Sequence, residues 1–469
     1  MNAANDPTAA HHVHQSEELD RAITGRLLYF YVLGDVLGSG IYALVGVMAG
    51  QVGGAFWMSF ALGVAAAMLT GFAYAELITK YPRAGGASTF THRAFDNRFG
   101  TFVVTFCMIS AGLAATGALA LAFSGYFVDL MEPVLTVPVL IAALVFVIVL
   151  ALINFRGISE SVKLNLAMSI TELSGLAIVL AIGVWVVLRG DADFGRPFEF
   201  NEGNPALLIL SGAVLAFFAM SGFENSANVA EEVQDPSRVY PRALLGGMAT
   251  AGVIYLVIAF TAAIVTPTER LAGSEVALLE VVKTGMPGFP GWLFSIIACI
   301  AITNTCLVAL ITMSRIMYGM GREHVVPRVF ARTHHSRRTP WVAIIFTTFI
   351  ALLLMGGVGE NGVGTLASAT VAFLLAVFTL VCICSLVLRR DQVQEQHYTA
   401  PTAVLALGVV VNIALLLYVL ISDLRDLIGG EIGVLESTSV VCAVMLAIGL
   451  VLYVVNNLAS TRLDAAIED

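Results

Sequence analysis

Long apolar stretches recur along the whole chain, and they constrain its fold more than any other feature. A helix that crosses the roughly 30 Å hydrocarbon core of a bilayer needs roughly 20 apolar residues. We expect about twelve such spans, near residues 27–50, 54–79, 97–128, 134–153, 161–188, 205–232, 239–264, 289–321, 341–357, 363–388, 401–421 and 437–457. Because 58% of the residues are hydrophobic and only 12% are charged, the chain is predicted to be an all-α integral membrane protein.

Two of these spans are interrupted by glycine at matching positions. The first interruption lies within Gly34–Tyr42 and the second within Phe217–Asn225. Lipid offers no hydrogen-bond partner, so a backbone is interrupted at membrane depth only where it faces protein, water or a ligand. Interrupted helices in corresponding positions of two repeats are typical of the substrate site of secondary transporters. Close packing between helices is the alternative explanation of the glycines.

The interrupted spans are the first and the sixth, which predicts two repeats of five helices. An odd number of helices per repeat gives the two copies opposite orientations in the membrane. The sequence therefore predicts an inverted-repeat core over 27–398, followed by spans 11 and 12 over 399–457. These last two spans are nearly free of polar residues, and we expect them at the periphery or in a dimer contact of a monomeric or homodimeric protein.

The basic residues are distributed unequally between the two sides of the predicted membrane. Of the 24 Lys and Arg residues, five lie on one side and the other nineteen on the opposite side. The five are Arg189, Arg196, Arg270, Lys283 and Arg425. By the positive-inside rule, the N-terminal tail over 1–26 and the C-terminal tail over 458–469 are expected in the cytoplasm, on the inner side of the cell membrane.

Several function classes find no support in the sequence. There is no phosphate-binding glycine-rich motif, so transport is expected to use an ion gradient or exchange. The six Cys residues lie in predicted spans, which argues against a disulfide framework or a metal site. The short basic clusters act as topology signals, so no nucleic-acid partner is expected. We expect neither a cofactor nor an enzymatic activity.

Five short motifs occur in a recognisable order. They are Gly38–Tyr42, Tyr74–Leu77 with Tyr81–Gly86, Phe217–Glu224, Ala230–Arg242 and Ser314–Tyr318. Together they resemble those of the amino acid/polyamine/organocation (APC) superfamily, and especially of bacterial relatives of the cationic amino acid transporters. The resemblance covers nearly the whole chain, and it implies a LeuT-like fold and a permease function.

The ends of the broken helices suit the two ends of an amino acid. The half-helix that begins near Ser39 presents free N–H groups and a positive dipole end to a carboxylate. The carbonyls where the sixth span unwinds suit an ammonium group. The resemblance implies the same roles for two sets of residues. These are Ser39, Gly40 and Ile41 for the carboxylate, and Phe218, Ala219 and Ser221 for the amine.

Two further positions are candidates for the walls of the site. Phe223 is expected beside it as a gate or wall, although an aromatic side chain in an apolar helix is more often part of the core. Asn304 lies between Thr303 and Thr305 in the eighth span. These polar side chains either line the substrate's side-chain pocket or form hydrogen bonds between helices.

Three carboxylates lie in the interior of the predicted spans, away from the span ends, namely Asp35, Glu172 and Glu224. A charged residue at the centre of a span costs roughly 2.5 to 3.5 kcal/mol, so such residues normally face a cavity and have a task. Glu172 matches a position where the resemblance implies a lysine in several sodium-independent relatives. The sequence therefore predicts a coupling or gating role, with a proton, a sodium ion or the substrate's own positive charge among these acids.

These features predict a secondary active transporter of amino acids, cationic or small and neutral, that works by proton symport or exchange. The alternative is a carrier of polyamines or organic amines, in which the acids bind the substrate and the carboxylate turn is idle. A channel or sensor without a transport cycle is a third reading, which the paired interruptions disfavour.

Overall fold

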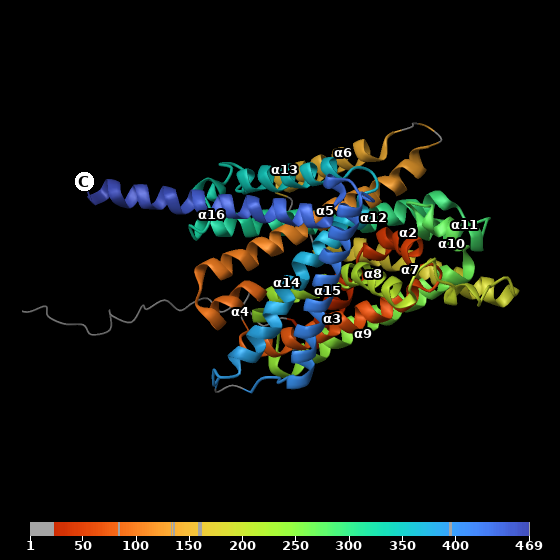
Figure 1. Cartoon of the computed structure of the whole chain (residues 1–469), viewed down its shortest axis with the longest axis horizontal. Coiled ribbons are helices and arrows are strands. Elements are labelled where there is room, and N and C mark those ends of the chain that lie inside the picture. The colour runs from red at the N-terminus through yellow and green to blue at the C-terminus, as the bar shows by residue number, and fades with distance from the viewer. Residues whose placement is uncertain are drawn as a thin grey trace, which may run out of the picture.

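The computed structural model describes residues 23–82, 85–132, 134, 137–157, 162–393 and 396–468, without the side chains of 162–166 and 459–468. Within those residues the chain is helical throughout, and no β-strand forms apart from one isolated bridge between Ile23 and Val233. The long helices lie side by side in one bundle (Figure 1). Residues 1–22 and Arg83, which belong to the predicted tail and to one motif, lie outside the described residues.

The described part of the chain has eleven candidate membrane spans, or twelve when the bent pair is counted as one span, in agreement with the prediction of about twelve. Each of the eleven is a helix long and apolar enough to cross a membrane. In order they are α1 (Gly25–Val36) with α2 (Gly40–Val52), α3 (Phe56–Lys80), α5 (Arg98–Met131), α6 (Val139–Arg156), α7 (Val162–Arg189), α8 (Pro205–Ala219) with the 3₁₀ segment η3 (Phe223–Glu232), α9 (Pro236–Val265), α12 (Gly291–Arg322), α13 (Trp341–Val358), α14 (Val363–Leu388), α15 (Thr402–Gly429) and α16 (Thr438–Glu468).

Three short helices were not predicted from the sequence. They are α4 (Gly86–Phe95), α10 (Thr268–Ala272) and α11 (Ala277–Gly285), each too short for a window of transmembrane length. Two boundaries also differ: α15 continues to Gly429, and α16 runs to Glu468 through residues predicted as a tail. Such differences are expected, because hydropathy locates the apolar part of a helix and not its ends.

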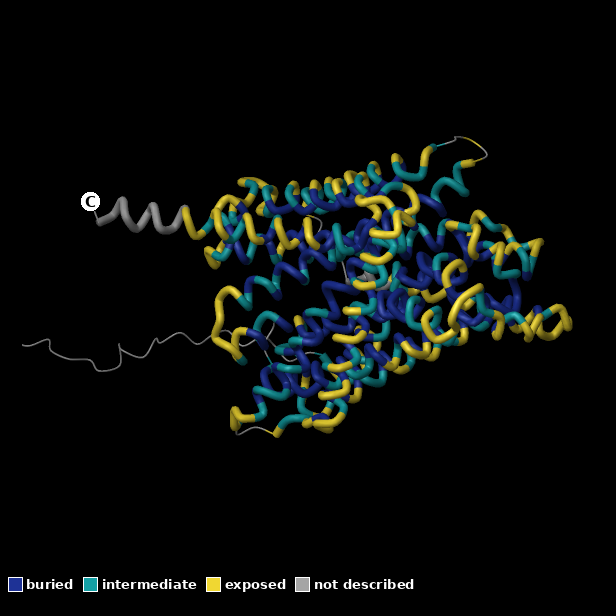
Figure 2. The backbone as a smooth tube through the Cα atoms, in the orientation of Figure 1, coloured by how far each residue is buried: buried dark blue, intermediate teal, exposed yellow. Residues whose placement is uncertain are grey.

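The outer helices expose apolar side chains at helical spacing. On α6, Ile141, Val145, Ile148 and Leu152 are all exposed and follow one another at intervals of three or four residues. Only 28% of the apolar window of α15 and of α16 is buried inside the molecule, the lowest share among the spans. Figure 2 shows exposed segments along these outer helices and a buried centre. A continuous apolar surface of this kind matches lipid, and spans 11 and 12 lie at the periphery as predicted.

The two broken spans are joined at one end of the bundle. The N–H of Ile23, just before α1, donates to the carbonyl of Glu232 at 2.9 Å, and the N–H of Gln234 donates back to Ile23 at 3.0 Å. These bonds tie the start of α1 to the end of η3. The half-spans α1 and η3 are therefore held together on the side of the breaks away from α2 and α8.

Candidate functional site

The first span is interrupted at Leu37–Ser39, within the predicted segment. Leu37 has φ −72° and ψ 52°, and the N–H of Gly38 donates to the carbonyl of Val36 at 2.7 Å. This is the geometry of an inverse γ-turn. The chain bends by 42° there, and α2 begins at Gly40. The first N–H groups of α2, including those of Gly40 and Ile41, therefore lack a carbonyl one turn earlier within the helix.

The sixth span is interrupted at Met220–Gly222. Gly222 has φ +117°, a conformation that residues with a Cβ rarely adopt. A Cβ on Gly222 would lie 2.6 Å from the backbone oxygen of Asp35. Its N–H donates to Oε2 of Glu224 at 2.9 Å. Glycine is therefore required here both by the turn and by the close approach of the first span.

The two interruptions lie against each other. A Cβ on Gly40 would be 3.0 Å from the Cα of Ala219 and 3.5 Å from Cδ1 of Phe218. Asp35, at the end of α1, lies against the second turn, because a Cβ on Gly222 would be 3.8 Å from its Cγ. The residues predicted to bind a carboxylate and those predicted to bind an amine thus come together in one place, although they are some 180 positions apart in the sequence.

The carbonyls where α8 ends differ in what they already bind. Phe218 accepts from the N–H of Ser221 at 3.0 Å and from its Oγ at 2.7 Å. Within the described part of the chain, no backbone N–H donates to the carbonyls of Ala219 or Ser221. Of the three carbonyls predicted for an amine, Ala219 and Ser221 thus remain open to a ligand's donor, whereas Phe218 is engaged in the turn.

Three buried polar atoms near the first break have no hydrogen-bond partner among the described residues. They are Oγ of Ser39, Oδ2 of Asp35 and Oε1 of Glu172. Glu172, on α7, is 2% exposed and lies in electrostatic range of Asp35. Buried polar atoms are nearly always paired in a folded protein, so such a group of exceptions points to a ligand or ion that completes it.

Glu224 has a different environment from the other two acids. Its carboxylate accepts from the N–H of Gly222 and so closes the turn that follows α8. The sequence placed all three acids together as coupling or gating groups. The structure gives Glu224 a task in the local backbone, whereas Asp35 and Glu172 each keep an unpaired oxygen.

Phe223 belongs to a cluster of aromatic rings. It is fully buried, and its ring centroid lies 5.5 Å from that of Tyr74 and 5.3 Å from that of Phe378. Tyr74 also packs on Phe90 of α4 at 6.1 Å. The cluster runs from the turn after α8 to the end of the bundle where α3 ends. These rings therefore pack the turn after α8 against α3, α4 and α14.

The polar group of the eighth span lies on α12. Oγ1 of Thr303 donates to the carbonyl of Cys299 at 2.6 Å, and Oγ1 of Thr305 donates to that of Ala301 at 3.4 Å. Oγ1 of Thr305 is also 3.9 Å from the position of a Cβ on Gly38. Asn304 is buried on the same helix. Thr305 therefore reaches the first break.

Three tyrosines hold the first break: Tyr42 belongs to a motif found in the sequence, whereas sequence reasoning did not single out Tyr126 and Tyr255. The hydroxyl of Tyr255, on α9, donates to the carbonyl of Val36 at 2.6 Å and lies 3.4 Å from that of Gly38. Tyr42 donates to the backbone of Glu172 at 2.8 Å, and Tyr126 donates to the carbonyl of Tyr42 at 3.2 Å. No sequence signal distinguishes Tyr126 and Tyr255 from ordinary core tyrosines.

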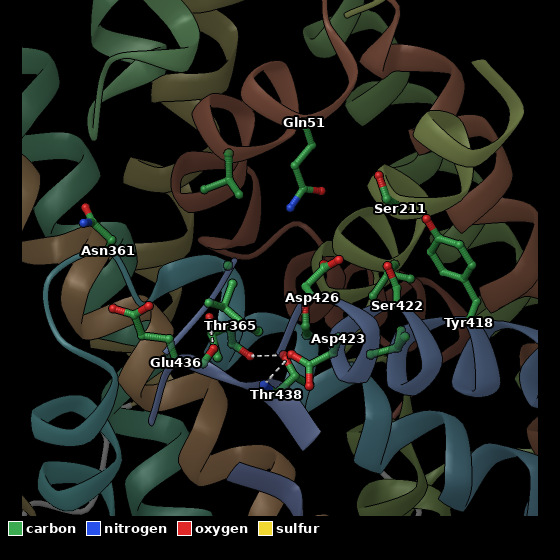
Figure 3. Close-up of a pocket in the computed structure, with 16 residues that line it drawn as sticks. Gln51, Ser211, Asn361, Thr365, Tyr418, Ser422, Asp423, Asp426, Glu436 and Thr438 are labelled. Atoms are coloured by element: carbon green, nitrogen blue, oxygen red, sulfur yellow. Dashed lines mark hydrogen bonds between the residues drawn. The ribbon is translucent and has the colours of Figure 1, made fainter. Parts of the chain in front are cut away.

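A hollow of about 350 Å³ lies beside the parts of α2 and α8 that lead away from the breaks, and Figure 3 shows the side chains that line it. It is lined by polar side chains from α2, α8, α14 and α15 and by the start of α16, while Val47 and Val214 line it nearest to the breaks. Asp423 caps α16 through the N–H groups of Thr438 at 2.7 Å and Ser439 at 2.8 Å. The volume is within the range of small-molecule sites, and the hollow approaches the breaks from this side.

A network of charges closes the opposite end of the bundle. Arg389, just after α14, donates to both carboxylate oxygens of Glu76 at 2.9 and 2.8 Å. The N–H of Ala400 donates to the same carboxylate at 2.7 Å. Tyr81 donates to Asp391 at 2.6 Å. Glu76 is therefore an anchor between α3 and the connection from α14 to α15.

Comparison with known proteins agrees with this architecture. The sequence profile described as "Amino acid permease" matches residues 27–448, which is most of the chain. The chain belongs to the amino acid permease family. It is a multi-pass membrane transporter and not an enzyme, as predicted.

Individual relatives are similar at modest identity and differ in substrate. The branched-chain amino acid permease BcaP of Bacillus subtilis is 25% identical over 377 residues, which cover 77% of this chain and 79% of the relative. The methylthioribose transporter of the same organism is 26% identical, over 80% of this chain and 83% of the relative. The chloroplastic cationic amino acid transporter 9 of Arabidopsis thaliana is 28% identical, over 64% and 55% respectively.

Proposed function

We propose that this protein carries an amino acid across the membrane by gripping both ends of the molecule at the two breaks. The carboxylate binds the N–H groups at the start of α2, beside Ser39, Gly40 and Ile41. The ammonium group binds the open carbonyls of Ala219 and Ser221. The observation that carries this proposal is the direct contact of the two turns, Gly40 against Ala219.

The substrate is proposed to be a cationic or a small neutral amino acid. In the described residues no Lys or Arg forms an ion pair with Asp35 or Glu172. An excess of unpaired acids favours a substrate with positive charge. Relatives named for branched-chain and for cationic amino acids both support the amino-acid class. A carrier of polyamines or organic amines is the second candidate, favoured by the same acids.

Coupling is proposed to involve a proton that Asp35 or Glu172 binds and releases in each cycle, with sodium as the alternative ion. The unpaired buried oxygen of each carboxylate supports this role. Exchange of one substrate for another remains the alternative to symport.

The orientation is proposed from the basic residues. Lys80 and Arg389 lie at the end of the bundle where the aromatic cluster is packed, and the positive-inside rule favours that end as cytoplasmic. The hollow of Figure 3 then opens toward the outside. In this arrangement the hollow lies on the outer side of the breaks, and Tyr74, Phe223 and Phe378 pack on the cytoplasmic side.

A thermal-shift screen of the purified protein against amino acids, diamines and monoamines tests the substrate class. A ligand at about 100 times its dissociation constant stabilises the folded state by about 2.7 kcal/mol. Stabilisation by amino acids supports the proposal. Stabilisation by putrescine or cadaverine but by no amino acid contradicts it and favours the amine carrier.

Uptake into proteoliposomes with an imposed pH gradient tests the coupling. Asp35→Asn or Glu172→Gln should still exchange substrate across the membrane but lose accumulation against its gradient. Glu224→Gln is the matched control, because an amide oxygen can still accept from the N–H of Gly222. Unchanged accumulation in both acid variants, or accumulation that follows sodium and ignores pH, would remove these acids from the proton role.

A further inference from the structure

Tyr255 lies at the one place where the first span could close into a continuous helix. It is fully buried on α9, and its ring packs against Phe60 with a centroid distance of 5.9 Å. Its hydroxyl donates to the carbonyl of Val36 at 2.6 Å and lies 3.4 Å from that of Gly38. Both carbonyls belong to the interruption between α1 and α2.

These two carbonyls have specific partners in an uninterrupted α-helix. Each N–H donates to the carbonyl four residues earlier, so Gly40 would donate to Val36 and Tyr42 would donate to Gly38. In the structure, the hydroxyl of Tyr255 stands beside both acceptors instead. The N–H groups of Gly40 and Tyr42 are thereby left without their intrahelical partners.

We infer that Tyr255 is a positioning residue for substrate binding: by occupying the carbonyls of Val36 and Gly38, it keeps the N–H groups of Gly40 and Tyr42 free for the substrate's carboxylate. This inference rests on the proposed function, because it assigns the freed N–H groups to a carboxylate. It extends that proposal to α9, a helix that contains none of the residues predicted to bind the substrate.

The bond competes directly with closure of the helix. Without the hydroxyl, the carbonyl of Val36 keeps only the γ-turn bond from the N–H of Gly38 at 2.7 Å, and the carbonyl of Gly38 loses its neighbouring donor. An unpaired buried carbonyl is unfavourable, so the N–H of Tyr42 becomes the remaining backbone donor for Gly38, and the N–H of Gly40 can replace the hydroxyl at Val36. Straightening the span in this way withdraws the groups that would bind the carboxylate.

The chain offers a matched control on the same pair of helices. The hydroxyl of Tyr29, on α1, forms a hydrogen bond with Oγ1 of Thr250, on α9, at 2.7 Å. This bond also joins α1 to α9, but it lies more than two helical turns from the break. Tyr29→Phe therefore removes a comparable hydroxyl contact without touching the carbonyls of Val36 or Gly38.

The first experiment compares ligands that differ only in the carboxylate. Binding of L-leucine and isoamylamine, and of L-arginine and agmatine, is measured for wild type, Tyr255→Phe and Tyr29→Phe. The loss of one buried hydrogen bond predicts a roughly 5- to 30-fold weaker affinity of Tyr255→Phe for the amino acid. The affinity for the amine should not change, and Tyr29→Phe should bind both as wild type does.

Two results would overturn the inference. One is an unchanged affinity of Tyr255→Phe for the amino acid. The other is an equal loss of affinity for the amino acid and the amine in Tyr255→Phe, or an equal loss in Tyr255→Phe and Tyr29→Phe. A general weakening of the packing between α1 and α9 would produce either pattern. If wild type binds neither L-leucine nor L-arginine, the cationic part of the substrate class proposed above loses its support.

A second measurement needs no ligand, so it tests the role of Tyr255 even if the wild-type protein binds none of these compounds. Hydrogen–deuterium exchange of the segment 37–44 reports whether the N–H groups of Gly40 and Tyr42 are bonded. Tyr255→Phe should slow their exchange relative to wild type, while Tyr29→Phe should not. Equal exchange in wild type and Tyr255→Phe would show that the hydroxyl does not hold the break open.

Discussion

Replacing Gly222 with alanine should lower the free energy of unfolding. The loss should be larger than for a turn glycine that has open space around it. Two effects add at this position. A residue with a Cβ at φ +117° carries backbone strain of about 1–3 kcal/mol. The new Cβ would also lie 2.6 Å from the backbone oxygen of Asp35. Relieving such overpacking costs a further free energy of about 1–3 kcal/mol. The expected loss in free energy of unfolding is therefore about 2–6 kcal/mol.

Two control substitutions separate these effects. Gly190 has φ +78° and open space around it, so Gly190→Ala should show the strain alone, about 1–2 kcal/mol. Gly34 lies inside α1 with no atom within 4 Å of a new Cβ, so Gly34→Ala should be neutral or stabilise by up to about 1 kcal/mol. The assay is thermal unfolding of the purified variants in detergent. Equal midpoints for Gly222→Ala and Gly190→Ala would refute the close contact between the two broken spans.

Three further predictions concern the contacts around the site and at its closed end. Gly40→Ala should weaken amino-acid binding without loss of expression, because its Cβ would lie 3.0 Å from a backbone atom of α8; wild-type affinity in a binding assay would mean that the turn adapts freely. Arg389→Met should lower the free energy of unfolding by about 3–5 kcal/mol, since it leaves the buried Glu76 carboxylate without its cation, and adding Glu76→Gln should restore part of the loss. The pKa of Asp391 lies below its ordinary value because Tyr81 donates to it. Its contact therefore favours the folded state above the ordinary pKa of about 3.9 and is lost as the pH falls through the lowered pKa. Tyr81→Phe should accordingly unfold at a higher pH in an acid titration followed by circular dichroism.

The spans and their interruptions could be predicted from the sequence because the bilayer imposes simple rules. A segment must be long and apolar to cross it, and a break within such a segment needs partners that lipid cannot supply. Gly38 and Gly222, which lie within apolar spans, therefore indicate the two breaks. The short helices α4 and α10 were not predicted, because neither is long enough or apolar enough to be recognised as a membrane span.

The contacts within the site could not be predicted, because they depend on which helix faces which. Nothing in the sequence indicates that the hydroxyl of Tyr255 reaches the carbonyl of Val36 across 219 positions. A local bond was also not predicted: the hydroxyl of Ser221 donates to the carbonyl of Phe218, one of the three carbonyls predicted to bind the amine. Ser and Asp often bond to nearby backbone in this way, but the choice of partner is made by the fold.

The most direct test of the two-ended grip is competition by analogues that lack one end of the substrate. An amino acid that binds the wild-type protein is compared with its methyl ester, which loses the carboxylate, and with its N-acetyl derivative, which loses the ammonium charge. Putrescine and cadaverine complete the set. If the N–H groups beside Gly40 and the carbonyls of Ala219 and Ser221 hold the two ends, each modified amino acid should bind at least about tenfold more weakly, a change of 1.4 kcal/mol, and the diamines should not compete. Competition by the diamines and the ester, with no loss relative to the parent amino acid, would contradict the grip and favour a carrier of amines.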